Sequence, residues 1–376
     1  MQLLRKVRAA TRAARDLKSA HAETGASVPS MLRDLVYLNL TRKMGIRAYF
    51  NYRLFDPKIS AAAKADYLPD SRWGKQRIWR ALNPEKYRFP FYNKLIFGSV
   101  FGGAGLPIPR TLGVFDAEVG YSLDGRSLKT AAELEQWLRC HGDQGFVFKP
   151  VWGTEGYQVL VFTGRAPDDP RVYLTLSGDR YDPEAMVAYS RKTAPLLGHM
   201  HSYLIQELVR PHPVLADFVG PTLCCVRVVT LIDSSGKPTI LGAVYKLQPG
   251  NEGVDHLSHG AVGCWVDLET GALGPGRSRQ DLRWSDVIPG TERRFVGFEL
   301  PDWNRVKELA LSAAMVFPWA RSIGWDIAIS DHGPVLIEGN AHWSPSLLQI
   351  PAPRGLMTGE LKAMIDALGS GRTATP

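Results

Sequence analysis

Cysteine is scarce in this chain of 376 residues, whose four cysteines are Cys140, Cys224, Cys225 and Cys264. None of them belongs to a CxxC pair, so the spacing argues against a cysteine-ligated zinc site. Four cysteines without a disulfide-framework pattern suit a reducing compartment. We therefore expect a cytoplasmic protein.

Several familiar sequence signals are absent. No run of about 18 apolar residues occurs, so no transmembrane helix is expected. The first residues are basic without an uninterrupted apolar segment, which argues against a secretory signal. The chain has neither a GxxxxGK(S/T) phosphate loop nor a GxGxxG turn after a strand. These absences disfavour the P-loop and dinucleotide-binding folds.

Negative charge is scarce in the first quarter of the chain. Residues 1–88 contain 19 Lys and Arg against 7 Asp and Glu, a net charge of +12, whereas the remainder has 26 against 30, a net charge of −4. Such a concentration predicts an anionic partner, such as RNA, a lipid headgroup or a phosphorylated substrate; a solvated surface is the alternative. Peripheral association with a membrane therefore stays open.

Apolar periodicity predicts the elements of the chain. Residues 1–21 have helical spacing with a basic outer face, and we expect this helix to pack on the protein rather than insert into a membrane. Further helices are predicted over 29–53, 71–82, 129–141 and 302–321, and one after Asn93. Strands are predicted within 146–162, 202–209, 226–247, 262–273 and 324–340.

Oxygen-bearing side chains end the stretch GWDIAISDHGPVLIEGN, residues 324–340. Read as two strands around a turn at residues 331–334, this stretch brings Asp326 close to Glu338 and Asn340 at one end of a hairpin. Glu338 and Asn340 are two residues apart and so share a face. Three such side chains fit Mg²⁺ held together with substrate phosphates. The alternative is the start of a loop after a buried strand.

Cations in apolar strands are a second signal. Lys149 precedes the glycine-containing loop of FVFKPVWGTEG, where it can contact a phosphate. Arg227 and Lys246 lie within apolar strands, and burying a charge is costly unless it is paired, so each should face a cleft or an anion. Glu207 ends the strand of LIQELVRPHP, and the apolar exit after it can accept an adenine ring.

The order of these signals resembles the ATP-grasp superfamily over roughly residues 93–350. It begins with Asn93-Lys94 and GLPIPRT, continues with Lys149 and Glu207, and ends with the aspartate strand and the Glu-x-Asn strand. The phrases LIQELVRPHP, SHGAVGCWVDLETGAL and GWDIAISDHGPVLIEGN are similar to the bacterial sugar-transfer-associated branch, which is related to α-L-glutamate ligases. The resemblance implies an α+β ATP-grasp fold, in which two α+β subdomains clamp ATP between antiparallel sheets.

The same resemblance implies a domain organisation. Residues 1–90 would form a basic, mainly helical N-terminal region, and residues 91–145 a preceding α/β segment. Residues 146–210 would be the first ATP-grasp subdomain, with the Lys149 loop, and residues 211–368 the second, with the magnesium and phosphate site. Residues 369–376 would be a flexible tail.

ATP and Mg²⁺ are the implied cofactors. The residue roles carried over by position are Lys94 and Lys149 on the ATP phosphates, Glu207 and Val209 on adenine, Arg227 or Lys246 on the transferred phosphoryl group, and Asp326, Glu338 and Asn340 on two Mg²⁺ ions.

The implied reaction is an ATP-dependent ligation. A carboxylate would be phosphorylated to an acyl phosphate and then attacked by an amine or another nucleophile, to form an amide bond in the amine case, with release of ADP and phosphate. One alternative is a kinase on the same fold that phosphorylates a hydroxyl. Another is a nucleic-acid or membrane-surface binding protein with a degenerate nucleotide site. A homodimer is a further expectation, since dimers are common in the superfamily.

The chain departs from related ligases at several positions. Gly324 stands where dipeptide ligases have an arginine that grips the substrate carboxylate, which puts that mode of binding in doubt. Cys224 and Cys225 stand where the branch has Asn-Thr. His342 and Trp343 follow the magnesium motif and are candidate specificity residues, with simple packing as the alternative. We expect specificity to lie in loops 153–156, 249–260 and 341–349.

Overall fold

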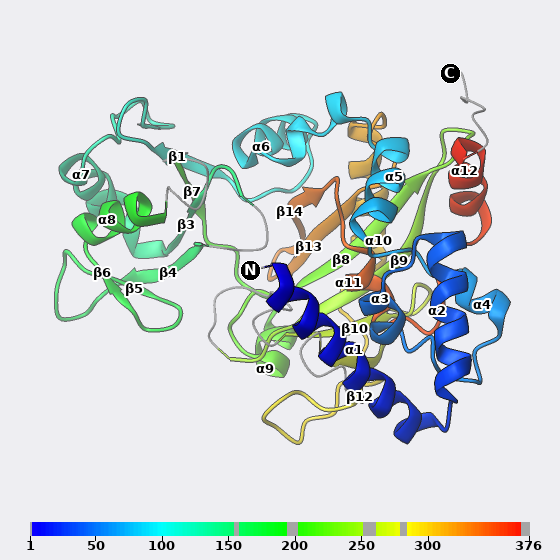
Figure 1. Cartoon of the computed structure of the whole chain (residues 1–376). Helices are drawn as coiled ribbons and strands as arrows, with labels where there is room; N and C mark the ends of the chain where they lie inside the picture. The colour runs from blue at the N-terminus through cyan, green and yellow to red at the C-terminus, as the bar shows by residue number, and fades with distance from the viewer. Residues whose placement is uncertain (1, 154–157, 194–201, 251–260, 279–283, 370–376) are drawn as a thin grey trace.

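The computed structural model describes residues 2–153, 158–193, 202–250, 261–278 and 284–369 (Figure 1). Its helices are α1 (Gln2–Thr24), α2 (Val28–Arg42), α3 (Ile46–Asn51), α4 (Ala61–Ala65), α5 (Arg72–Leu82), α6 (Lys94–Gly103), α7 (Ala131–His141), α8 (Pro183–Thr193), α9 (Pro213–Val219), α10 (Trp303–Val316), α11 (Pro345–Gln349) and α12 (Gly359–Gly369), with short 3-10 turns at Glu85–Tyr87, Phe89–Phe91 and Gly142–Gln144. Within the described chain, no helix is both long and apolar enough to cross a bilayer.

The strands of this part of the chain form two antiparallel sheets. The first has the order β2-β1-β7-β3-β4-β5-β6 and the second has the order β12-β11-β10-β9-β8-β13-β14. Their bounds are β1 (Thr111–Phe115), β2 (Tyr121–Ser122), β3 (Phe146–Pro150), β4 (Leu160–Arg165), β5 (Tyr173–Thr175), β6 (Arg180–Tyr181), β7 (Tyr203–Glu207), β8 (Cys225–Ile232), β9 (Pro238–Leu247), β10 (Val262–Val266), β11 (Leu273–Ser278), β12 (Trp284–Ser285), β13 (Gly324–Ser330) and β14 (Gly333–Asn340).

The first sheet is covered by α7 and α8, which lie together on one side of the molecule in Figure 1. Helix α7 begins with a capping box, in which Thr130 accepts from the backbone of Glu133 and the Glu133 side chain reaches back. Trp137 of this helix is buried in one cluster with Phe146 and Phe148 of β3. Strand β1 pairs with β7, so residues 111–122 belong to the same sheet as the predicted first subdomain. The predicted domain boundaries stay predictions.

The second sheet holds the largest part of the core. Strands β8 and β9 form the predicted hairpin, and β13 and β14 form the next one, with Ser330 opposite Gly333. The turn between β13 and β14 is therefore two residues shorter than the predicted 331–334. Helix α10 packs on this sheet through a face that includes Val306 and Ala310. It ends at Val316 and not at the predicted 321, because Phe317 precedes a proline and leaves the helical region.

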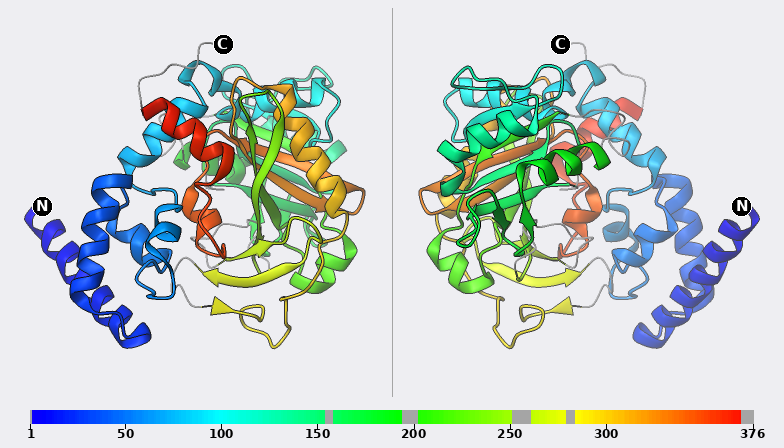
Figure 2. Two further views of the ribbon diagram at one scale, coloured as in Figure 1. Left: turned by 90° about the vertical axis from the view of Figure 1, so that its right-hand side faces the viewer. Right: turned by 90° about the vertical axis from the view of Figure 1, so that its left-hand side faces the viewer.

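The N-terminal region is helical, as predicted, but one helix predicted as continuous is interrupted. The expected helix 29–53 is split into α2 and α3, because Lys43 adopts a left-handed conformation at φ 56°. Its N–H donates to the carbonyl of Asn39 and closes the last turn of α2, and Gly45 then starts α3. Figure 2 shows α1 and α2 side by side at the outer edge of the molecule.

Candidate active site

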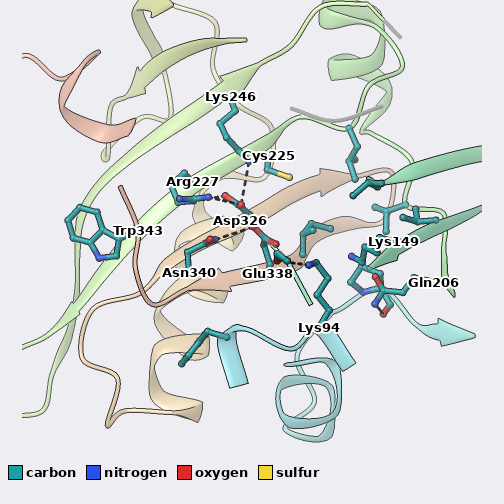
Figure 3. A pocket seen from close by; sticks show the side chains of 18 of the residues that line it. Lys94, Lys149, Gln206, Cys225, Arg227, Lys246, Asp326, Glu338, Asn340 and Trp343 are labelled. Atoms are coloured by element: carbon teal, nitrogen blue, oxygen red, sulfur yellow. Dashed lines mark hydrogen bonds and ion pairs between the residues drawn. The ribbon is translucent and has the colours of Figure 1, made fainter. Parts of the chain in front are cut away.

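A cavity of about 1640 Å³ is bounded by both sheets and by the end of the N-terminal region. The first sheet contributes β3, β4 and the exit of β7, and the second contributes one face of β8, β9, β13 and β14 (Figure 3). Every sequence-predicted site residue lines this cavity; the set is Lys94, Lys149, Glu207, Val209, Arg227, Lys246, Asp326, Glu338 and Asn340. Residues between positions 94 and 340 thus converge on one cleft.

The sheet register places three charged side chains in one row. Asp326 of β13 is opposite Arg227 of β8 on one side and opposite Glu338 of β14 on the other. Residues directly opposite on neighbouring strands point to the same face, so all three face the cavity. The predicted proximity of Asp326 to the Glu338 and Asn340 end of the hairpin is confirmed, and Asn340 is opposite Gly324.

Asp326 is the centre of a buried ion cluster. Arg227 donates to both carboxylate oxygens, with Nε 2.6 Å from Oδ1 and Nη2 2.8 Å from Oδ2, and Lys246 Nζ lies 3.4 Å from Oδ2. Burial alone would raise the pKa of Asp326, but the two cations outweigh it and hold the pKa well below its usual range. Arg227 and Lys246 are therefore paired, as the cost of burying a charge requires.

Glu338 and Asn340 form the open end of this row. The amide of Asn340 donates to Glu338 Oε1 and to the carbonyl of Gly324, each at 3.3 Å. A β-bulge between Asp326 and Ile327 adjoins them and turns the end of the hairpin. In the described part of the chain, no three His, Cys, Asp or Glu side chains cluster in a metal-binding arrangement. The oxygen donors here are two carboxylates and one amide.

Two lysines face this row from the other side of the cleft. Lys149 lies in β3, and burial together with the neighbouring Lys94 lowers its pKa to about 8. Lys94 starts α6 behind the N-cap Asn93, and burial lowers its pKa as well. The carboxylate of Glu338 opposes both shifts, so it lies close enough to act on both ammonium groups. Lys94 Nζ donates to the carbonyl of Gly153 at 2.8 Å.

The exit of β7 forms the far wall. Glu207 Oε1 accepts from the backbone N–H of Arg110 at 2.7 Å, and its other oxygen lies 3.7 Å from Arg110 Nε. The carboxylate of Glu207 is therefore used to join β7 to the segment before β1. Leu208 and Val209 also line the cavity at this point.

Gly324 is required by packing. A Cβ at this position would lie 2.7 Å from the Cβ of Trp343 and 3.0 Å from the Cδ of Arg227. The place where related ligases have an arginine is thus filled by Trp343 and by the stem of Arg227. Trp343 is buried and donates from its indole N–H to Ser322 Oγ at 3.1 Å. This buried position gives Trp343 a packing role, which is the alternative to a role in specificity.

The part of the remaining wall that α5 forms was not predicted from the sequence to line the site. Lys75, Trp79 and Arg80 of α5 line the cavity, in a region that charge alone marked as a surface. His342 also lines it, and its Nδ1 lies 3.1 Å from the Tyr92 hydroxyl. Burial lowers the pKa of His342 to about 4, with Arg88 adding to the shift, so the ring is neutral at pH 7. The helix itself was predicted over 71–82, but no sequence pattern places it at the cavity, because its position depends on packing between distant segments of the chain.

Of the three loops predicted to carry specificity, residues 154–156 and 251–260 lie outside the described residues. Residues 341–344 and 347 of the third loop line the cavity.

Two antiparallel sheets that enclose a cleft lined by lysines on one side and by carboxylates on the other are the arrangement expected from the resemblance to ATP-grasp proteins. The chain belongs to the sugar-transfer associated ATP-grasp family, whose model matches residues 75–364. This match confirms the resemblance and the α+β ATP-grasp fold predicted from the sequence. A comparison with curated protein sequences finds no match.

Solved ATP-grasp structures resemble the chain at low identity. The biotin carboxylase domain of 2-oxoglutarate carboxylase from Hydrogenobacter thermophilus, in complex with MgADP, ADP and bicarbonate, has a TM-score of 0.43 and 14% identity, over 77% of this chain and 48% of that one. D-alanyl-alanine synthetase A from Vibrio cholerae has a TM-score of 0.44 and 10% identity, over 76% and 66%. The chain thus spans about half the length of the carboxylase domain that it matches.

Proposed function

We propose that the chain binds ATP with Mg²⁺ in this cleft and activates a carboxylate as an acyl phosphate, which a nucleophile then attacks. The observation that carries the proposal is the charge layout of one cavity. Lys94 and Lys149 stand on one side, the cluster of Arg227, Lys246 and Asp326 stands on the other, and Glu338 lies within electrostatic reach of both lysines. A polyphosphate with a divalent cation complements this layout.

The nucleotide would lie along the first sheet. Lys94 and Lys149 would hold the phosphates. Burial lowers the pKa values of both lysines, and a bound phosphate would favour their charged forms. The adenine would lie at the exit of β7 against Leu208 and Val209, where the backbone can bind the ring edge. The Glu207 carboxylate accepts a hydrogen bond from Arg110, so Glu207 would bind the adenine through its backbone while its side chain holds this wall of the cavity in place.

The oxygen donors at the end of the hairpin fit Mg²⁺. Asp326 and Glu338 are opposite each other on neighbouring strands, and a contact with Glu338 further lowers the pKa of Asp326. A cation between two carboxylates on neighbouring strands would relieve their mutual repulsion. Glu338, Asn340 and Asp326 would hold the ion, with Asp326 shared between the ion and its two cationic partners. When bound, Mg²⁺ would neutralise charge on the phosphates.

The reaction would depend on the two cations beside Asp326. A carboxylate oxygen of the substrate attacks the γ-phosphorus, the bond from that phosphorus to the β,γ-bridging oxygen breaks, and ADP leaves. Arg227 and Lys246 stabilise the negative charge that spreads over the transferred phosphoryl group. An amine then attacks the acyl carbon, phosphate leaves, and the amine nitrogen loses a proton. A kinase would stop after the first transfer, to a hydroxyl.

The second substrate would enter at the wall formed by α5 and His342. The exposed guanidinium of Arg80 and the ammonium of Lys75 face this end of the cleft beside Trp79. Neutral His342, hydrogen bonded to Tyr92, would offer a polar contact without adding charge. This wall suits a substrate that carries a negative charge near an apolar or ring-shaped part.

Hydroxylamine trapping tests the proposal. The protein is incubated with ATP, Mg²⁺ and a panel of carboxylates, and we expect a carboxylate-dependent hydroxamate with one ADP formed for each hydroxamate. Glu338→Ala should abolish the signal, whereas Glu308→Ala, an exposed glutamate on α10 outside the cleft, should keep it. ADP formation with phosphate retained on a hydroxyl product, and no hydroxamate, would establish the kinase instead.

A further inference from the structure

Helix α2 carries an apolar stripe that faces solvent. Val28, Leu32, Val36 and Leu40 follow one another at four-residue spacing and so lie on one face of the helix. Leu32 is 47% exposed, Val36 is 60% exposed and Leu40 is 67% exposed. Single exposed apolar residues need no explanation, but a continuous stripe of them marks an interaction surface.

The stripe is not the packing face of α2. That face is formed by Met31 and Leu38, which are buried with Tyr49 of α3 in the core of the N-terminal region. The helix is also capped at both ends, by the Ser27 hydroxyl and by the left-handed Lys43. Among the residues that the structure describes, the folding of this region leaves the outer face of α2 exposed, so its apolar side chains are available to a partner.

Exposed basic side chains occur on the same two helices. Arg33 of α2 and Lys43, directly after this helix, are exposed, and so are Arg12, Arg15 and Lys18 of α1, which lies beside α2 in Figure 2. Few acidic groups offset this charge, because residues 1–88 carry 19 basic residues against 7 acidic ones. Asp34, the acidic residue within α2, is paired with Lys64 at 2.7 Å.

We propose that α2 and the neighbouring basic face of α1 dock on a bilayer that contains anionic lipids, with α2 lying in the interface. An apolar stripe flanked by Lys and Arg is the pattern of helices that bind a membrane surface without crossing it. A second copy of this chain fits less well, because two such basic faces would repel each other. RNA would use the charge but would leave the apolar stripe without a role. The inference does not depend on the proposed function.

Co-sedimentation with vesicles tests the proposal on the full chain. The protein is mixed with vesicles of phosphatidylcholine alone or of phosphatidylcholine with phosphatidylglycerol, at low and high salt. We expect binding to the anionic vesicles that weakens as salt is raised. Replacing the stripe by Leu32→Gln, Val36→Gln and Leu40→Gln leaves the charge unchanged and should weaken the binding at least about tenfold. These residues are exposed, so the variant keeps its core.

Two further variants separate the sources of binding. The triple change Arg12→Gln, Arg15→Gln and Lys18→Gln should also weaken binding by about tenfold or more, since each basic residue near an anionic surface contributes. The control Val119→Gln with Leu123→Gln, two exposed apolar residues beside β1 and β2, should bind like the wild type.

Three results would overturn the proposal. The first is equal binding of vesicles by the wild type and the stripe variant, because non-specific electrostatic attraction would then account for the binding. The second is a dimer by sedimentation velocity that the stripe variant loses, which would assign the stripe to a second copy. The third is binding of RNA oligonucleotides without any binding to anionic vesicles.

Discussion

Removing the charge of Asp326 should destabilise the protein strongly. In the folded state this carboxylate accepts two hydrogen bonds from Arg227 and lies 3.4 Å from Lys246, and the side chains of the two cations are only 10% and 9% exposed. Asp326→Asn keeps the shape of the side chain and removes the charge. Two buried cations then lose the carboxylate that they share, and we expect a loss of about 3–5 kcal/mol in the free energy of unfolding.

The pH dependence of this effect follows from the depressed pKa of Asp326. A carboxyl whose pKa is lower in the folded state stabilises the fold above its unfolded pKa and loses this effect as the pH falls through the folded pKa. The difference between wild type and variant should therefore be constant from about pH 5 to pH 8 and shrink progressively as the pH falls below about 4, the unfolded pKa of an aspartate.

Urea denaturation followed by tryptophan fluorescence measures the loss, with an unchanged m-value as the sign that both proteins unfold alike. The matched control is Asp217→Asn, which breaks an exposed pair with Arg293 at 3.6 Å and should change stability little. If Asp326→Asn were no more destabilising than this control, the buried cluster would not be held by charge and the reasoning would fail.

Two further predictions follow from the site. Lys149, with its pKa lowered to about 8, should lose its proton as the pH rises from about 7 to about 9, so the affinity for nucleotide should fall over this range. Calorimetry should find an affinity that does not change with pH for Lys149→Arg, because arginine stays charged. An affinity of the wild type that does not change with pH would contradict the prediction. Gly324→Ala should lower the stability measured by thermal unfolding by about 1–3 kcal/mol, because the added Cβ would meet Trp343. The control Gly103→Ala, in open space at the end of α6, should be nearly neutral. Equal effects of the two substitutions would contradict the packing argument.

The hairpin end of the site was predictable from the sequence because its residues are close together along the chain. Glu338 and Asn340 share a face by alternation, and a tight turn brings Asp326 opposite Glu338. The resemblance to ATP-grasp proteins added Lys94 and the order of the elements. The charge count of the N-terminal region marked it as basic and its apolar periodicity marked it as helical, but one left-handed residue, Lys43, divides the predicted helix 29–53.

The ion cluster and the α5 wall depend on long-range packing. Arg227 and Lys246 were expected to face an anion, but identifying it as Asp326 needs the strand order β9-β8-β13 and its register. The reach of Arg80 into the cleft depends on where α5 packs, and Trp79 lies against Trp343 with ring centroids 4.8 Å apart. No local sequence pattern carries such information, since these contacts join residues at least 80 positions apart.

Calorimetric titration of ATP with Mg²⁺ tests the central claim most directly. We predict metal-dependent binding by the wild type that is lost in Glu338→Ala and in Lys149→Ala, and that is kept in the exposed controls Glu308→Ala and Lys192→Ala. Absence of binding by the wild type, or equal binding by all five proteins, would contradict the assignment of this cleft as the nucleotide site.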